Sequence, residues 1–438
     1  MNNVMIKSNH VNSEFHEVID WFSHTFIELN YTCLVSWLLN FVLDASHRSF
    51  GDGSTLAAST DKNIPDSFNG VPSNLYPLVI TFRTFLLMLD GTLGNSYFER
   101  YYNLKGKDLG SRLVELETLI LRKEVNYERF DSIYWPHFNT QLCKKMDSYQ
   151  VFTEIMSHIK GGSRTVEHGK LSREDYCTLS ESRASSLSIE IRNMIYDIFQ
   201  SYEKMKIHYG EFDLGDVVVD VHSRLRNKRY KGDKMNFVYI DEVQDLTMAQ
   251  IALFKHICRN VEDGFVFCGD TAETVGRGID FRFEDVRSIF YKMFVLESKS
   301  YNDNQRKEKG HISDIFVLGQ NFRTNAEVLK LSQSILELLY HFFPHSTDKL
   351  KVETSLIDGE APVVIRSRNN ANSILTAFGK SKNNGDNLGR SGTEQVVLVR
   401  DNLAKEEVLQ VAGKQALVLT ILECKGLEFQ VVVTSELD

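Results

Sequence analysis

Residues 237–245, Phe-Val-Tyr-Ile-Asp-Glu-Val-Gln-Asp, constrain the fold more than any other part of this chain. The first four are β-branched or aromatic, which is typical of a buried parallel strand. Asp241 and Glu242 follow directly, and ligands of open α/β sheets bind beyond the carboxyl ends of strands. Thr247 and Gln250 then have the spacing of a capping box, which indicates a helix start. The pattern predicts a strand, an acidic turn and a helix.

Two adjacent carboxylates at such a turn suit nucleotide hydrolysis. That reaction needs a Mg²⁺ ion that bridges phosphate oxygens and a group that orients the attacking water. Mg²⁺ is usually held by only one or two carboxylates besides waters and phosphates. We therefore assign Asp241 to the metal and Glu242 to the water, as in a Walker B element. The alternative is an acidic helix entry that the helix dipole favours without any chemistry.

The composition fits an ordinary globular protein, with 42% hydrophobic and 25% charged residues. A length of 438 residues suggests about three domains. The net charge of −9 argues against a basic coat over the whole surface but allows a local basic groove. The six cysteines are scattered, which indicates neither a zinc site nor a disulfide framework. We find no membrane span and no targeting signal, so we expect no membrane partner and a nuclear or cytoplasmic location.

The order of patterns along the chain predicts an α/β protein with a helical insertion. Residues 1–43 have helical apolar spacing, and residues 76–82 indicate a buried strand followed by a helix over about 83–90. From about 98 to 210, strand-like runs give way to helical periodicity. Further strands are predicted at 264–269, 315–318, 362–365, 395–399, 416–421 and 430–433.

Two local features allow more than one interpretation. The aromatic residues within 127–149 could stack on bases, but packing in a core explains most of them equally well. The basic residues between Arg224 and Lys234 could contact a phosphate backbone. They could also form a solvated helix end, where cations suit the helix dipole.

Four short blocks stand in a fixed order at the ends of predicted strands. They are Asp241-Glu-Val-Gln-Asp, Gly269-Asp-Thr-Ala-Glu, Leu318-Gly-Gln-Asn-Phe-Arg-Thr and Thr420-Ile-Leu-Glu-Cys-Lys-Gly-Leu-Glu-Phe. Together they resemble motifs II, III, IV and V of superfamily 1 helicases of the UvrD/Rep type. The resemblance is closer still to the UvrD-like domain of TPR-and-ankyrin-repeat-containing proteins and their plant relatives, in which a run such as Asp280-Phe-Arg-Phe-Glu-Asp is typical.

The resemblance implies two RecA-like P-loop NTPase-type domains, each a parallel sheet flanked by helices and each incomplete here. ATP and Mg²⁺ would bind between them, and single-stranded DNA or RNA would cross the top. The implied activity is that of an ATP-dependent helicase or translocase. The first domain would comprise residues 1–97 and 211–300, the helical insertion 98–210, and the second domain 301–438.

The resemblance also implies roles for motif II and III residues. Asp241 would bind Mg²⁺, Glu242 would activate water, and Gln244 would sense the state of the nucleotide. Asp270 would support the phosphate end of the site. Glu273 would face the phosphates at a position where the family has a glutamine. A carboxylate ~4 Å from a phosphate charge costs about 4 kcal/mol at an effective dielectric constant of about 20.

Further roles fall on the later motifs. Arg323 would reach the γ-phosphate, because a guanidinium fork suits phosphate oxygens, and the alternative is a surface salt bridge. Thr324 and Glu327 have capping-box spacing, which predicts a helix start beside it. Three further positions are implied to contact ribose (Glu428) and the nucleic-acid backbone (Thr420 and Lys425).

An aromatic residue and an arginine after motif III, Phe281 and Arg282, resemble a base-stacking pair of bacterial relatives. They lie further from Glu273 than that pair does. Stacking on a base and burial of Phe281 and Phe283 in the core are the competing interpretations.

The sequence departs from the family pattern at several places. It has no Gly-x-x-x-x-Gly-Lys-[Ser/Thr] phosphate loop, and Ile374 replaces the first glycine before the one Gly-Lys-Ser, at residues 379–381. Motif VI is missing, and Leu422 replaces a histidine of bacterial motif V. We therefore expect a fragment of a longer protein, which by itself binds ATP weakly. The alternative is a catalytically weak or inactive helicase-like scaffold that binds other proteins.

Overall fold

The computed structural model describes most of the chain in two compact units, Met1–Gly359 and Glu360–Asp438. In both units, parallel strands and helices occur together, which agrees with the predicted α/β class. The predicted domain boundaries stay predictions. Among the described residues, no helix combines the length and the apolar character that a membrane span requires. The described residues are 4–6, 64–102, 109–138, 146–182, 187–274, 278–296, 312–342, 348–349, 351–363, 395–412, 417–425, 427, 429 and 431–434.

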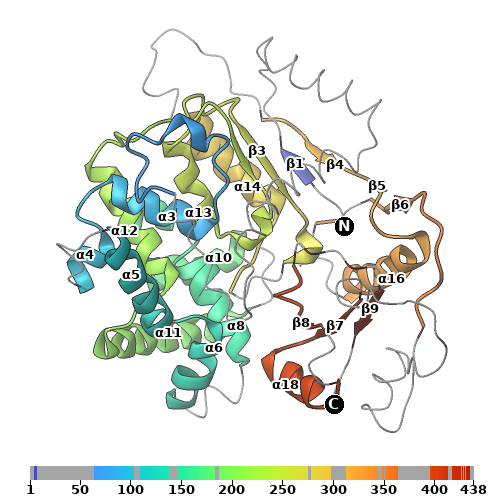
Figure 1. Cartoon of the computed structure of the whole chain (residues 1–438). Coiled ribbons are helices and arrows are strands. Elements are labelled where there is room, and N and C mark those ends of the chain that lie inside the picture. The colour runs from blue at the N-terminus through green and yellow to red at the C-terminus, as the bar shows by residue number, and fades with distance from the viewer. Residues whose placement is uncertain are drawn as a thin grey trace. The chain divides into compact units, whose positions relative to one another are not determined.

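The first unit contains a four-stranded sheet in the order β2-β3-β1-β4, of which β3, β1 and β4 are labelled in Figure 1. β2 and β3 are parallel, whereas β1 pairs antiparallel with both β3 and β4. β4 therefore runs in the same direction as β2 and β3, and the chain leaves all three at one edge of the sheet. The strands are β1 (Val4–Ile6), β2 (Val238–Ile240), β3 (Phe265–Gly269) and β4 (Ile315–Val317).

The predicted helix over residues 1–43 is wrong at β1. The three apolar residues of β1 complete backbone ladders on both sides, which a helix could not do. The rest of that prediction lies outside the described residues. The strands predicted at 237–240, 264–269 and 315–318 are confirmed within one residue at either end.

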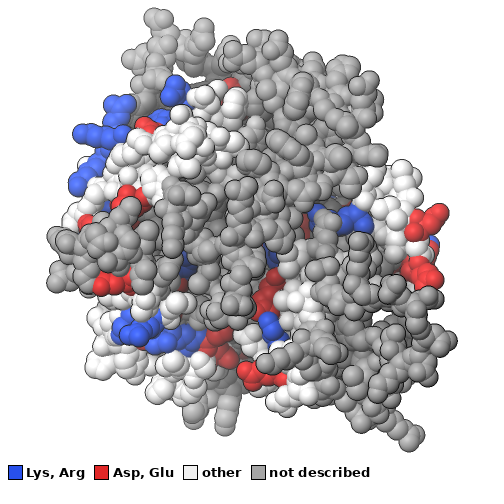
Figure 2. All heavy atoms as spheres, viewed as in Figure 1, with Lys and Arg blue, Asp and Glu red and all other residues white. Residues whose placement is uncertain are grey.

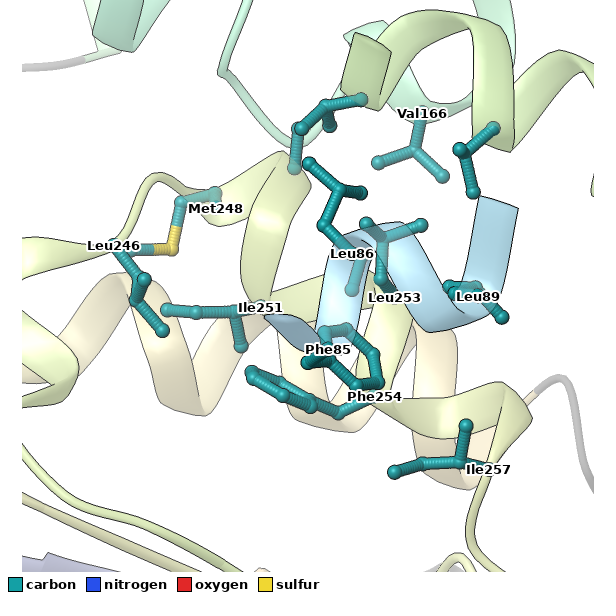
Figure 3. Packing of buried hydrophobic residues seen from close by; sticks show 14 of the residues in the cluster. Phe85, Leu86, Leu89, Val166, Leu246, Met248, Ile251, Leu253, Phe254 and Ile257 are labelled. Carbon is teal, nitrogen blue, oxygen red and sulfur yellow. The ribbon is translucent and has the colours of Figure 1, made fainter. Parts of the chain in front are cut away.

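Helices pack against this sheet and bury a large apolar core. In Figure 3, side chains of α3 (Phe82–Thr92) meet those of α13 (Met248–Leu253) and of the turn η6 (Phe254–His256) that follows it. The ring centroids of Phe85 and Phe254 lie 4.6 Å apart. The predicted capping box that starts α13 is confirmed, because Thr247 and Gln250 exchange side-chain and backbone hydrogen bonds. The same core includes residues of α12 (Leu214–Asn227) and α14 (Phe283–Ile289).

The predicted strand over residues 76–82 is wrong. Pro77 has no amide hydrogen to donate to a ladder, and residues 76–81 join none of the sheets. Instead, the Thr81 side chain accepts a hydrogen bond from the Thr84 amide at 3.1 Å and caps α3. The helix predicted after this strand is confirmed.

A second core lies within the predicted helical insertion. Phe130, Tyr134 and Phe138 are buried in it together with apolar residues of α11 such as Phe199 and Tyr202. This burial confirms core packing for these aromatic residues. The elements that contribute to this core are α6 (Tyr127–Arg129), η2 (Phe130–Tyr134), α8 (Ser148–Thr153), η4 (Glu154–Ile159), α10 (Arg173–Ser182) and α11 (Ile189–Tyr209). The apolar residues of α4 (Tyr97–Tyr102), α5 (Leu109–Lys123) and α9 (Thr165–His168) pack against the first core instead.

The first unit ends with a short parallel pair, β5 (Gln320–Asn321) and β6 (Thr354–Ser355), and with α16 (Ala326–Phe342). The second unit is a parallel sheet in the order β8-β7-β9 with one helix between its first two strands. Its strands confirm those predicted at 395–399, 416–421 and 430–433. Residues 362 and 363 are not in a strand, and 364–365 lie outside the described residues. The elements of this unit are β7 (Gln395–Val399), α18 (Asn402–Ala412), β8 (Val418–Thr420) and β9 (Val431–Thr434).

Candidate nucleotide site

Asp241 and Glu242 form an acidic turn at the carboxyl end of β2. The Asp241 side chain is exposed, and its Oδ1 accepts a hydrogen bond from the Glu242 amide at 3.0 Å. Glu242 has φ +52° and ψ +38°, a left-handed conformation that residues other than glycine rarely adopt. Such backbone strain clusters at functional sites. Motif II therefore has both an accessible carboxylate and a locally strained backbone.

Gln244 ties the acidic turn to motif III. Its side chain is buried, with Nε2 donating to Glu242 Oε2 at 2.5 Å and Oε1 accepting from the Asp270 amide at 3.1 Å. A Cβ at Gly269 would lie 2.2 Å from Gln244 Oε1, so any side chain there would displace the Gln244 amide. The buried amide thus fixes the Glu242 carboxylate relative to the end of β3.

Motif III begins directly after β3 and folds back on itself. Asp270 is buried, and its Oδ1 accepts from the Ala272 amide at 2.8 Å, which starts the turn η7 (Thr271–Glu273). Glu273 is half-buried, and its amide donates to the Asp270 carbonyl at 3.1 Å. The buried Thr271 hydroxyl has no hydrogen-bond partner in the described part of the chain. A buried polar group of this kind is normally satisfied by water or a ligand.

Motifs II and III lie at the same edge of the sheet. Ile240 pairs in register with Phe267 on the parallel strand, so Asp241 lies beside Cys268. Burial, and after it the charge of Asp241, raises the pKa of the Cys268 thiol to about 12. The strand register and the pKa of Cys268 both indicate that motifs II and III lie close together.

Motif IV follows β4, which ends at this edge too. Arg323 is exposed, and its amide and that of Thr324 both donate to Asn321 Oδ1, at 2.9 and 2.8 Å. The predicted capping box of Thr324 and Glu327 is wrong. Asn325 caps α16 instead, because its Oδ1 is within 3.1 Å of the Glu327 amide and 3.0 Å of the Val328 amide.

The aromatic pair after motif III is buried. Phe281 is 3% exposed and Phe283 1%, and their rings are in T-shaped contact with centroids 5.1 Å apart. The interpretation as core residues is confirmed for both. Base stacking by Phe281 stays a prediction that would require the ring to leave this core. Arg282, half-buried just before α14, also stays a predicted nucleic-acid contact.

The basic residues before β2 have mixed surroundings. Arg224 pairs with Asp90 and Asp220, and Arg226 donates to the carbonyls of Val166 and Glu167. These two arginines thus have structural partners, as the helix-end interpretation implies. On the face shown in Figure 2, basic and acidic side chains of the described residues are interspersed.

In the second unit, motif V has a local network that the sequence reasoning missed. The Thr420 amide donates to Glu423 Oε2 at 2.8 Å, and the Glu423 amide donates to Thr420 Oγ1 at 3.2 Å. Lys405 of α18 contacts the same carboxylate at 2.6 Å. The Thr-x-x-Glu spacing of a capping box was the available signal. Lys425 is half-buried, and Glu428 lies outside the described residues.

The donor set fits Mg²⁺ better than it fits a whole nucleotide. Asp241 and Glu242 offer the carboxylate oxygens that Mg²⁺ prefers, and the neighbouring turn has the buried Thr271 hydroxyl, which has no partner among the described residues. The sequence has no phosphate loop, so it lacks the amides and the lysine that cradle the phosphates in P-loop enzymes. Asp241 and Glu242 are therefore the residues here that could hold a Mg²⁺ ion.

In this mixed sheet, the acidic turn after β2 is tied to the end of its parallel neighbour β3 through the buried Gln244. Residues 99–275 match the UvrD/REP helicase N-terminal domain family. The predicted resemblance is confirmed, and the chain is related to UvrD-like helicases.

The chain is also similar to a particular relative, the human (Homo sapiens) "TPR and ankyrin repeat-containing protein 1". The two are 31% identical over 399 residues, which is 82% of this chain. The chain spans about 13% of the length of that relative.

Proposed function

We propose that this chain is part of an ATP-dependent helicase or translocase core that acts on single-stranded nucleic acid. The observation that supports it most is the Gln244 bridge, which joins the acidic turn to motif III at one sheet edge. An acidic helix entry would need no buried amide to fix its second carboxylate. The relationship to UvrD-like helicases supports the same proposal.

Each residue of the site then has a distinct task. Mg²⁺ would neutralise phosphate charge, and the exposed Asp241 carboxylate is the group to hold it. Glu242 orients the attacking water and accepts its proton, while its hydrogen bond to Gln244 fixes the direction of the carboxylate. Because Gln244 is occupied at both ends, it reports on the nucleotide through Glu242 and Asp270 rather than by direct contact.

Residues of the later motifs have further proposed roles. Arg323 would stabilise charge on the γ-phosphate, and its exposed position after β4 leaves the guanidinium accessible. Thr420 and Lys425 would contact the nucleic-acid backbone, and Glu428 the ribose. A phosphate loop on a longer product would supply the remaining contacts. Glu273 lowers the expected affinity, because its carboxylate repels the phosphates unless it is protonated or bridged by the metal.

The test is ATP turnover by this chain with and without single-stranded DNA and RNA. We expect slow turnover that Glu242→Gln abolishes and that Glu284→Gln, an exposed control on α14, leaves unchanged. Glu242→Gln keeps the size of the side chain and an acceptor for Gln244, so loss of activity would not reflect misfolding. Turnover that is equal in the wild type and Glu242→Gln would contradict the proposal.

A catalytically inactive scaffold is the second candidate, and α16 supplies an observation in its favour. Exposed apolar side chains recur along this helix at intervals of three and four residues, the spacing of a helix–helix seam. A folded chain that binds no ATP would support this candidate. The residues of the stripe are Val328, Leu331, Ile335, Leu338 and Phe342.

A further inference from the structure

A short segment of the helical insertion, residues 157–161, contacts the chain on both sides of the candidate site. Ser157 lies in η4, where the Lys160 amide reaches back five residues to the Ile155 carbonyl at 2.9 Å, as in a π-helix. The buried Ser157 hydroxyl donates to the Gly278 carbonyl at 2.7 Å and accepts from the Asp280 amide at 2.8 Å. One side chain therefore binds the chain just beyond motif III.

The other end of the segment contacts the helix that follows motif II. The Gly161 carbonyl accepts a hydrogen bond from the Ala249 amide, in the first turn of α13, at 2.8 Å. A Cβ on Gly161 would lie 2.8 Å from Thr247 Cβ and 2.3 Å from the Met156 carbonyl oxygen. Only glycine allows this close approach to the helix cap that ends the acidic turn.

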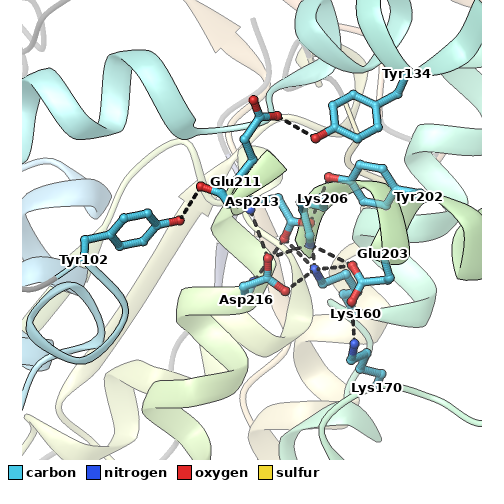
Figure 4. Close-up of polar contacts among 11 residues, drawn as sticks. Tyr102, Tyr134, Lys160, Lys170, Tyr202, Glu203, Lys206, Glu211, Asp213 and Asp216 are labelled. Carbon is cyan, nitrogen blue, oxygen red and sulfur yellow. Dashed lines mark hydrogen bonds and ion pairs between the residues drawn. The ribbon is translucent and has the colours of Figure 1, made fainter. Parts of the chain in front are cut away.

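Between these two contacts, Lys160 enters a buried ionic cluster (Figure 4). Its ammonium, with no exposed surface, lies 2.6 Å from Asp213, 2.6 Å from Asp216 and 3.3 Å from Glu203. Lys206 contacts the same three carboxylates. We call these five residues the buried ionic cluster. It joins the insertion to the start of α12.

The three carboxylates are close enough together to hold a metal ion, but two ammonium groups already contact all of them. Lys170 adds a third positive charge at Glu203. The cluster is thus balanced in charge by its own chain. Because buried paired charges resist separation, it holds the backbone at Lys160 in place.

We propose that Ser157 and Gly161 are positioning residues that keep the acidic turn and the loop after motif III in a fixed relation, with the buried ionic cluster anchoring the segment between them. The inference rests on the proposed function, because the relative position of these two segments affects hydrolysis only if the chain hydrolyses ATP. A π-helical turn at this place agrees with it, since such turns occur frequently at functional sites. The helical insertion is thereby coupled to the site chemistry.

Hydrogen exchange at single backbone amides tests the coupling without any activity. In Ser157→Ala we expect exchange at Asp280 to speed up by about tenfold, because a buried hydrogen-bond pair is lost. A smaller increase should reach Ala249, which Ser157 does not bond. Ser157→Thr keeps the hydroxyl and should restore both rates. Ser201→Ala, which removes an exposed hydroxyl bonded to the Asp197 carbonyl, should change neither.

A second variant approaches from the other end. Gly161→Ala should speed up exchange at Ala249 directly and at Asp280 through the segment. If either variant speeds up exchange only at the amide that it contacts directly, the proposed coupling is overturned. Where the chain turns over ATP, both variants should lower kcat with KM unchanged. Coupled exchange in a chain without turnover would remove the proposed function and leave the coupling intact.

Discussion

The buried ionic cluster and the acidic turn both contain carboxylates, which are buried and paired with lysines in the cluster but more exposed in the turn. In the cluster, Asp213 is fully buried and contacts both lysines. Burial by itself would raise the pKa of Asp213, but the ammonium groups of Lys160 and Lys206 hold it well below its usual range. In the acidic turn, by contrast, Asp241 is exposed at a strand end.

The difference shows how one residue type serves two purposes. A carboxylate that lysines of the same chain neutralise does not attract a further cation. Removing one member of such a buried pair leaves the other charge unpaired in the protein interior. An exposed carboxylate on a strained turn contributes little to stability but is accessible to a metal. Stability and chemistry should therefore respond to substitution in separate places.

The largest expected effect is that of Lys160→Met in the buried ionic cluster. The substitution leaves the buried Asp213 with Lys206 as its remaining lysine, while Lys170 contacts only Glu203 from the outside. Breaking a buried pair in this way costs about 3–5 kcal/mol. Urea unfolding followed by circular dichroism measures this change in the free energy of unfolding.

The matched control is Lys170→Met, whose side chain is 46% exposed and contacts Glu203 from the outside. Exposed pairs contribute about 0–1 kcal/mol. Equal losses in the two variants would remove the distinction between a structural cluster and a solvated one.

The pH dependence of stability separates buried groups of the two charge types. Burial lowers the pKa of His222 from 6.5 to about 4, so the folded state binds fewer protons than the unfolded state in this range. His222 should therefore lower the free energy of unfolding by about 3 kcal/mol as the pH drops from about 6.5 to 4. His256, whose pKa burial lowers to about 3, adds to this fall. Burial by itself would raise the pKa of Glu203, but the charges of Lys160 and Lys206 outweigh burial and lower this pKa to about 2. Its contribution is present above about pH 4.5 and is lost only below that.

Urea unfolding at pH 7, 5.5 and 4.5, chosen to span roughly this window, measures the histidine step. His222→Gln keeps a donor for the Ala249 carbonyl, which His222 contacts at 2.7 Å, and should shrink the step. The exposed His168 provides the control, and His168→Gln should leave the step unchanged. A wild-type stability that is flat between pH 7 and 4.5 would contradict the assignment.

A smaller effect is expected at the acidic turn itself. Gly269→Ala places a methyl group 2.2 Å from Gln244 Oε1 and so displaces the bridge to motif III. Overpacking of this kind lowers the free energy of unfolding by about 1–3 kcal/mol. ATP turnover should also fall, even under conditions in which the variant is fully folded. Gly319→Ala is the control, because none of the described residues lies within 4 Å of its added methyl. If both variants unfold at the same urea concentration, the Gln244 bridge does not contribute to stability.

Much of the site could be predicted, because the relevant signals are local. The run before Asp241 forms β2, and the capping box of Thr247 and Gln250 starts α13. The order of the motif blocks led to the UvrD-like relationship that the comparisons support. Predictions failed where two local signals competed. The apolar run after Pro77 gave way to the Thr81 cap, and Asn325 took the place of Thr324.

The sequence by itself determined the alternation of strands and helices, the helical character of the insertion and the acidic turn, since each is written in neighbouring residues. Only the tertiary structure decided that Lys160 neutralises Asp213, 53 residues away, and that Gln244 bonds the Asp270 amide, 26 residues away. It also decided that Phe281 is buried and that β1 lies between β3 and β4. Periodicity sets which face of an element is apolar, whereas the pairing of a buried charge depends on which distant segment the fold brings within about 3 Å of it.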